Sequence, residues 1–193
     1  VTANPTDAPK AVFVSTFSDM PLAADFEVAL KGNEADFQTG VDALAKIAKV
    51  YLGVKPSASS ALTNAKNAEV TVFDGKCPAG NVGVQINHLA PVNKGEVVWT
   101  LGAEEVIFIG RLFNTGKVDL TRTIAVAGSE IKTPAYTKVL VGQQISSIVK
   151  GNVATDKKVR LIDGNPLTGL KVDENAFLSA HSTEITAIPE GDN

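Results

Sequence analysis

Short apolar runs separated by a helical pattern make up the first part of the chain. Residues 11–17 (AVFVSTF), 50–54 and 69–73 are rich in β-branched residues, which is typical of buried strands. Apolar residues at helical spacing predict an amphipathic helix over 34–49, with Asn33 as its N-cap in an arrangement close to a capping box. This order of elements predicts a parallel sheet, and right-handed crossovers would make the fold Rossmann-like.

Two further helices are expected before residue 117. The first begins with Pro78, where the missing N–H costs nothing, and ends near Pro91. Its apolar face is formed by Val82, Ile86 and Leu89. The second covers 103–114, with Gly116 just past its end. Apolar residues wrap most of its circumference, so we expect this helix to be buried on nearly all sides.

The pattern changes after residue 117. An alternating run, a second extended run, a short helix and two further strands follow in that order, over 121–127, 131–141, 143–149, 159–162 and 184–188. A hairpin, a helix and then more strands is the order of a β-grasp fold. The predicted fold class is therefore α/β. An exposed lead-in (1–10) precedes a Rossmann-like parallel-sheet domain (11–117) and a β-grasp α+β domain of the soluble-ligand-binding type (118–193).

The composition is that of an ordinary globular chain. It has 193 residues, of which 44% are hydrophobic and 20% charged, and a chain of this length can bury a core without disulfides. The net charge of −3 predicts neither a nucleic-acid partner nor attraction to an anionic membrane surface. The apolar runs are far shorter than the roughly 20 residues that a transmembrane helix needs. Because residues 1–10 resemble no signal peptide and lack an initiator methionine, we expect a segment of a longer protein.

Metal and nucleotide sites are not indicated by any spacing in the sequence. Cys77, His88 and His181 are the candidate metal ligands, and they form no C-x-x-C or paired-histidine motif. No G-x-G-x-x-G follows a strand. Residues 164–171 (GNPLTGLK) match a phosphate loop only superficially, because the lysine is displaced and the following hydroxyl is missing. We therefore predict a turn there, and neither a metal nor a bound cofactor such as NADH or FMN.

Cys77 is the strongest candidate nucleophile. It lies beside Lys76 and at the start of an expected helix, and both features favour the thiolate. A nucleophile also needs a base within reach. His88 lies further along the same expected helix, roughly 16 Å away at 1.5 Å per residue, and His181 is the remaining candidate base. A small cysteine enzyme is one hypothesis, and a structural cysteine is the preferred interpretation.

A set of short motifs extends over nearly the whole chain in a fixed order. They are AVFVSTFSDMPLAA (11–24), FDG (73–75), PAG (78–80), Gly83, PV (91–92), VW (98–99), IGRLF (109–113), TG (115–116), AG (127–128) and RLIDGNPLTG (160–169). Together they resemble the A subunit of the bacterial Na⁺-translocating NADH:quinone reductase. The common order makes the resemblance more specific than any single motif.

The resemblance implies a place in a respiratory complex. The family's A subunit is a peripheral component on the cytoplasmic face of the bacterial inner membrane, in a complex that oxidises NADH, reduces quinone and exports sodium. It carries no flavin or iron–sulfur cluster and is associated with ubiquinone. Its middle region is similar to the flavin-binding subunit of respiratory complex I, with a Rossmann-like and a β-grasp domain. The motifs cover that middle region, so we expect the N-terminal and C-terminal parts of the subunit to lie outside this chain.

One departure from the family concerns the Pro-Ala-Gly turn. The family usually has histidine where this chain has Cys77, and only His88 remains of a histidine-rich stretch further on. If this chain contacts quinone or another subunit, we expect the contact at this Gly/Pro-shaped turn, because α/β sheets bind ligands at the carboxyl ends of their strands. A purely conformational role is the alternative. The candidate residues are Phe73, Asp74, Gly75, Pro78, Ala79, Gly80 and His88.

Three hypotheses about function follow. The leading one is a non-catalytic, quinone-associated subunit domain of a sodium-pumping NADH:quinone oxidoreductase, inactive by itself, with other subunits and quinone as its partners. The second is a free-standing β-grasp module that binds a soluble ligand without catalytic activity. The third is the small cysteine enzyme.

Overall fold

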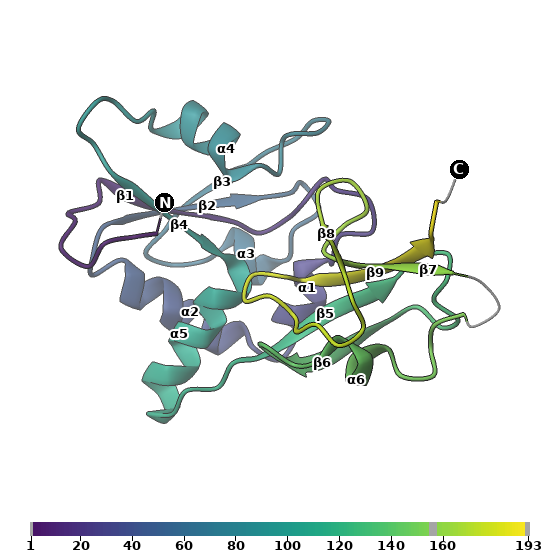
Figure 1. Ribbon diagram of the computed structural model, residues 1–193. Coiled ribbons are helices and arrows are strands. Elements are labelled where there is room, and N and C mark those ends of the chain that lie inside the picture. Colours follow the sequence, from purple (N-terminus) through teal and green to yellow (C-terminus); the bar gives the residue numbers. More distant parts are fainter. Residues whose placement is uncertain (1, 155–157, 192–193) are drawn as a thin grey trace. The chain divides into compact units, whose positions relative to one another are not determined.

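The computed structural model describes residues 2–154 and 158–191, which fold into two compact units. The first unit consists of residues 1–19 and 29–119, and the second of residues 20–28 and 120–193 (Figure 1). One unit contains a parallel sheet and the other a mixed sheet. The predicted fold class, Rossmann-like α/β followed by a β-grasp part, is confirmed.

The sheet of the first unit is parallel. Its strands are β1 (Ala11–Ser15), β2 (Lys49–Val54), β3 (Glu69–Val72) and β4 (Val98–Gly102), in the order β3-β2-β1-β4. β1 and β2 are buried almost throughout because the middle strands of a parallel sheet are covered on both faces. The sequence predicts β1 to β3 but not β4. The chain leaves β1 toward β2 and later returns to β4 on the other side of β1, so the topological switch point lies between β1 and β4.

The helices of the first half of the chain differ in detail from the sequence-based expectation. They are α1 (Phe26–Leu30), α2 (Glu34–Leu44), α3 (Ser60–Thr63), α4 (Val82–Leu89) and α5 (Ala103–Thr115). The predicted helix over 34–49 is present but ends at Leu44. The capping box is wrong, because the Asn33 side chain is engaged elsewhere. Its Nδ2 donates to the Ala29 carbonyl (2.8 Å) and its Oδ1 accepts from Arg111 Nη2 (3.0 Å).

The close contact between α2 and α5 depends on Gly40 and Gly110. A Cβ atom at Gly40 would lie 2.0 Å from the Val106 carbonyl oxygen, and one at Gly110 would lie 1.6 Å from the Asp36 carbonyl oxygen. Only glycine therefore allows the two backbones to approach this closely. The buried residues of α5 form one face, and Phe113 in its last turn is 67% exposed. The prediction that this helix is buried on nearly all sides is wrong, because its neighbours cover only part of its circumference.

The mixed sheet of the second unit has the strand order of a β-grasp fold. The elements are β5 (Thr121–Ala127), β6 (Ala135–Leu140), α6 (Ile145–Val149), β7 (Val159–Asp163), β8 (Leu170–Val172) and β9 (Glu184–Pro189). The sheet order is β6-β5-β9-β7-β8. β5 and β6 form an antiparallel hairpin, and the last strand, β9, returns parallel to β5. The core of this unit is aliphatic, with Ile124, Ile145 and Ile185 fully buried.

Three features of the second unit were not expected from the sequence. The extended run 131–141 forms a strand only from Ala135, because Pro134 has no N–H to give to a sheet. β8 is an additional edge strand. Residues 20–28 also join this unit, where the Asp25 N–H donates to Tyr136 Oη (2.9 Å).

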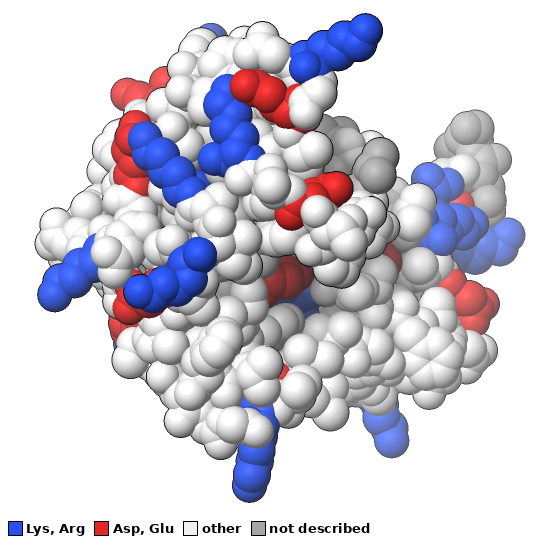
Figure 2. All heavy atoms as spheres, turned by 90° about the vertical axis from the view of Figure 1, so that its left-hand side faces the viewer, with Lys and Arg blue, Asp and Glu red and all other residues white. Residues whose placement is uncertain are grey.

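The surface carries charges of both signs. On the face shown in Figure 2, lysine and arginine side chains lie among aspartate and glutamate side chains rather than in one patch. Of the described helices, none is long and apolar enough to cross a bilayer.

Candidate functional site

The predicted contact residues lie in and beside the connection between β3 and α4, at the carboxyl end of the parallel sheet. We call residues 73–80 the site loop. The Phe73 N–H donates to the Val54 carbonyl (2.9 Å), which extends the pairing of β3 and β2 by one bond. Residues 74–78 are exposed, whereas Ala79 and Gly80 are half-buried. The loop thus presents an exposed turn between two fixed ends.

The imidazole of His88 lies beside the Phe73 ring. The two ring centroids are 6.5 Å apart and the planes are tilted by 58°. His88 is exposed in the last turn of α4. The structure therefore brings His88 to the start of the site loop, as an exposed hydrogen-bonding group next to an apolar ring.

The end of the site loop is fixed to β1 and the segment that follows it. Ser15 Oγ donates to the Gly80 carbonyl (2.9 Å), and the Gly80 N–H donates to Asp19 Oδ2 (2.5 Å). A Cβ atom at position 80 would lie 3.0 Å from the Phe17 carbonyl oxygen. A larger residue at Gly80 would therefore push the loop away from the segment that follows β1.

Gln85 is a residue of this region that the sequence patterns did not single out. It is only 1% exposed, and its Nε2 donates to Ser15 Oγ (3.0 Å) and to the Ala79 carbonyl (3.1 Å). Its Oε1 occupies the space above Gly53, where a Cβ atom would lie 2.1 Å away. The available signal was a polar residue one helical turn from Val82, on the predicted apolar face of the helix.

The structure corrects the predicted position of Cys77. α4 begins at Val82, where the Asn81 side chain accepts from the Gly83 N–H (2.8 Å) and so provides the N-cap. Pro78 therefore lies in the turn before the helix, after a cis Cys77–Pro78 peptide bond, and not in the first helical turn. Cys77 is exposed and shares no helix with His88. Cys77 thus lies outside the first turn of α4, where the sequence had placed it, which removes one support of the cysteine-enzyme hypothesis.

The strands that flank the switch point end near carboxylates of the chain itself. Asp19 follows β1 and already accepts from the Gly80 N–H. Glu105 follows β4, and its Oε2 lies 2.1 Å from where a Cβ atom of Gly102 would be. Nucleotide-binding sheets instead offer unbound backbone N–H groups to phosphates at this edge. In residues 2–154 and 158–191, no group of three or more His, Cys, Asp or Glu side chains is placed to hold a metal.

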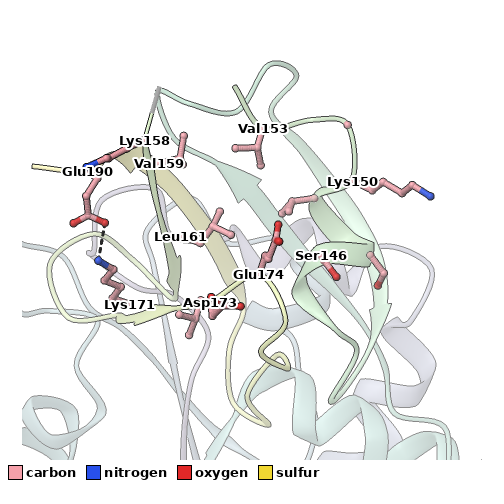
Figure 3. A pocket seen from close by; sticks show the side chains of 14 residues that line it. Ser146, Lys150, Val153, Lys158, Val159, Leu161, Lys171, Asp173, Glu174 and Glu190 are labelled. Carbon is pink, nitrogen blue, oxygen red and sulfur yellow. Dashed lines mark ion pairs between the residues drawn. The ribbon is translucent and has the colours of Figure 1, made fainter. Parts of the chain in front are cut away.

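A groove in the second unit lies between α6 and strands β7 and β8 (Figure 3). Its volume is about 1100 Å³, which is slightly above the usual range of small-molecule pockets. Its apolar walls also pack against the core of the unit, and they comprise Val149, Val153, Val159, Leu161 and Val172. No feature of the sequence indicates this groove.

Ion pairs form part of the rim of the groove. Glu190 Oε1 accepts from Arg160 Nε (3.0 Å), and Glu190 Oε2 lies 2.7 Å from Lys171 Nζ (Figure 3). The Arg160 guanidinium first, and then the Lys171 ammonium, lower the pKa of Glu190 to about 2. Glu190 is therefore ionised and paired at neutral pH.

Residues 164–169 of the segment 164–171 form the predicted turn, and its last two residues begin β8. The buried Asn165 side chain organises it, because Oδ1 accepts from the N–H groups of Leu167 and Thr168 (both 3.0 Å). These two N–H groups are therefore already bound within the turn and are not free to bind a phosphate. This agrees with the prediction of a turn rather than a phosphate loop.

Comparison with known families identifies the chain. Residues 1–118 match the family model of the NqrA second alpha/beta domain. The chain belongs to this family. Residues 123–174 match the model of the NQRA C-terminal domain. The resemblance found in the sequence motifs is confirmed.

Curated relatives agree with this assignment. Proteins named as A subunits of the Na(+)-translocating NADH-quinone reductase are 34% identical over 186 residues in Hahella chejuensis and 35% identical over 190 residues in Alcanivorax borkumensis. These matches cover 95% and 97% of this chain, but 41% and 42% of the relatives. A relative of the same name in Serratia proteamaculans is 34% identical over 193 residues. The chain spans about two-fifths of the length of these relatives.

A solved structure shares the fold of this NqrA family member. The crystal structure of an NAD⁺-reducing [NiFe]-hydrogenase in the H₂-reduced state superposes with a TM-score of 0.67 at 12% sequence identity. The match covers 94% of this chain and 41% of that one. At this identity the similarity concerns the fold alone.

Proposed function

We propose that this chain functions as part of a peripheral, quinone-associated subunit of a sodium-pumping NADH:quinone oxidoreductase. The observation that carries the proposal is the identity of 34% or more with named A subunits over at least 95% of the chain. Since the chain spans only about two-fifths of those relatives, we expect the redox reaction to require the complete complex. We expect this chain to be inactive alone.

The proposed partners are the other subunits of the complex and a quinone. The proposed location is the cytoplasmic face of the bacterial inner membrane. We propose that the chain holds no redox cofactor, and that ubiquinone or another quinone binds in the complete subunit or complex. The absence of a phosphate-binding glycine motif and the internal carboxylates beside β1 and β4 support the part of this proposal that concerns nucleotides.

The proposed contact surface is the site loop together with His88. An imidazole N–H can donate to a quinone carbonyl, and an aromatic ring such as Phe73 offers an apolar face to a quinone ring. The tilted, adjacent arrangement of the two side chains supports this pairing of roles. The exposed turn 74–78 supplies a surface for a neighbouring subunit.

The test uses cells that lack the gene for this protein and carry either the wild type or a variant. In membranes, we expect His88→Ala and Phe73→Ala to raise the KM for quinone about tenfold, the loss of roughly one hydrogen bond or ring contact. Reduction of an artificial electron acceptor by NADH should be unchanged. His181→Ala and Phe113→Ala are matched controls, because both replace exposed rings that are not part of the site loop or of α4. A wild-type KM for quinone in both site variants would refute the contact surface.

The groove of the second unit favours a second candidate function, a β-grasp module that binds a soluble ligand. The gene deletion separates the two candidates. Loss of sodium-dependent NADH oxidation on deletion of the gene would support the proposed role in the sodium-pumping complex. Unchanged sodium-dependent NADH oxidation would leave the ligand-binding module as the better account.

A further inference from the structure

We infer that Asp19 and Gln85 are positioning residues that hold the site loop across the carboxyl end of β1. The inference deepens the proposed function and rests on it, because a fixed loop matters for function only if the loop is a contact surface. The two side chains come from different segments of the chain and form hydrogen bonds with consecutive residues of the loop. Asp19 holds the N–H of Gly80, and Gln85 holds the carbonyl of Ala79.

Asp19 provides a charged acceptor for the loop backbone. Its Oδ2 lies 2.5 Å from the Gly80 nitrogen, and a hydrogen bond to an ionised acceptor is stronger than one between neutral groups. The loop backbone also lies close to the segment after β1, since a Cβ atom at Gly80 would be 3.2 Å from the Asp19 nitrogen. The contact thus depends on both the carboxylate and the missing side chain at position 80.

Gln85 provides the second anchor from the buried face of α4. Both N–H groups of its amide are used, one toward the Ala79 carbonyl and one toward Ser15 Oγ. Ser15 in turn donates to the Gly80 carbonyl (2.9 Å), so a chain of hydrogen bonds runs from α4 through β1 to the loop. Gln85 is buried and the rest of this network is half-buried, so removing one member leaves partners without their hydrogen bonds, and we expect these groups to act together.

The position of these anchors explains how an exposed turn can keep one shape. The turn 74–78 is held at its start by the Phe73 N–H and at its end by the anchors on Ala79 and Gly80. Loss of either anchor should free the end of the turn while the sheet itself remains folded. The expected result is a more mobile contact surface and not an unfolded unit.

The chain contains its own reporter for this motion. Cys77 is the single cysteine and is exposed in the middle of the site loop, so a nitroxide spin label can be attached there without further changes. In electron paramagnetic resonance spectra, we expect the label to be restricted in the wild type. We expect the mobile fraction to rise severalfold in Asp19→Ala and Gln85→Leu, the latter of which keeps a similar volume but has no donors.

Two variants serve as controls. Asp19→Asn keeps a side-chain oxygen that can accept from the Gly80 N–H and should retain most of the restriction. Asp7→Asn removes a carboxylate outside the site loop and should leave the spectrum unchanged. Circular dichroism of each labelled variant verifies that the chain is folded. If Gln85→Leu fails to fold, Asp19→Ala and its Asn partner still decide the question.

A second measurement separates this inference from the proposed function. In membranes with the complemented gene, Asp19→Ala should raise the KM for quinone about fivefold with little change in kcat, and Asp19→Asn should restore it. A mobile label with a wild-type KM would uphold the anchors but refute the site loop as a contact surface. A label that stays restricted in folded Asp19→Ala and Gln85→Leu would overturn the inference.

Discussion

The site loop and the groove are surfaces of opposite kinds, one in each unit. In the first unit, polar groups of the chain satisfy one another around Ser15, Asp19 and Gln85, and they leave an exposed turn in a fixed position. In the second unit, apolar side chains that belong to the core or pack against it form the walls of an open groove. A surface of the first kind gains specificity from geometry, whereas one of the second kind gains binding energy from any apolar group that covers it. The comparison indicates that substitutions in the two units should have different effects on stability and function.

The largest effect is expected from Gly110→Ala in the first unit. A methyl group there would lie 1.6 Å from the Asp36 carbonyl oxygen, so α2 and α5 must move apart. We expect a loss of about 3 kcal/mol in the free energy of unfolding. The single tryptophan, Trp99, lies in β4, so its fluorescence reports the first unit while circular dichroism reports both.

The control for this prediction is Gly191→Ala, because a Cβ atom at Gly191 meets nothing within 4 Å. The fluorescence transition of Gly110→Ala should move to lower denaturant and separate from the circular dichroism transition. If Gly110→Ala and Gly191→Ala unfold alike, the close helix contact is not what stabilises the first unit.

A smaller effect is expected from Leu161→Ala in the groove wall. Leu161 is half-buried and packs against the core of the second unit, so its truncation should cost about 1–2 kcal/mol. The matched control, Leu167→Ala, removes a leucine that is 70% exposed and should change the free energy of unfolding by less than about 0.5 kcal/mol. The transition observed by Trp99 fluorescence should not move. A shift of that transition would show that the two units do not unfold independently.

How far the sequence predicts these regions depends on whether a feature is periodic. β1 and the β5–β6 hairpin follow from apolar patterns, and Gly116 ends α5 with a φ of 70°, as its position just past the predicted helix indicates. Gly40, in contrast, costs helix propensity in the sequence but in the structure makes the contact with Val106 possible.

Only part of the candidate site could be proposed from the sequence. The loop could be located because Gly and Pro punctuate it after a strand. Asp19, one of its anchors, is distant from the loop in sequence. The other anchor, Gln85, belongs to the helix that follows the loop. No sequence pattern predicts that either side chain contacts the loop backbone. The groove could not be predicted for a similar reason. It is formed by α6, β7 and β8 together, and its shape depends on their packing rather than on a sequence pattern.

A pH-dependent effect is expected at the rim of the groove. The pKa of Glu190 is lowered from 4.5 to about 2 by Arg160 and Lys171, so its ion pairs stabilise the folded state above the unfolded pKa. This stability should be lost as the pH falls from about 4.5 to about 2. The measurement is the urea midpoint between pH 7 and pH 2, compared with Glu190→Gln. Parallel pH profiles in the two proteins would contradict the assigned ion pairs.

The smallest effect is expected from Cys77→Ser. The thiol is exposed in the turn before α4 and is not part of the first helical turn. NADH-driven quinone reduction in membranes should therefore stay within about twofold of the wild type. A loss of about a hundredfold or more would restore the cysteine-enzyme hypothesis.

The most direct test of the site is cross-linking with a photoreactive quinone in the assembled complex, followed by peptide mapping. We expect adducts on the site loop or on His88, and fewer of them in Phe73→Ala and in Asp19→Ala. Adducts confined to the groove walls around Leu161, or found only on other subunits, would contradict the account.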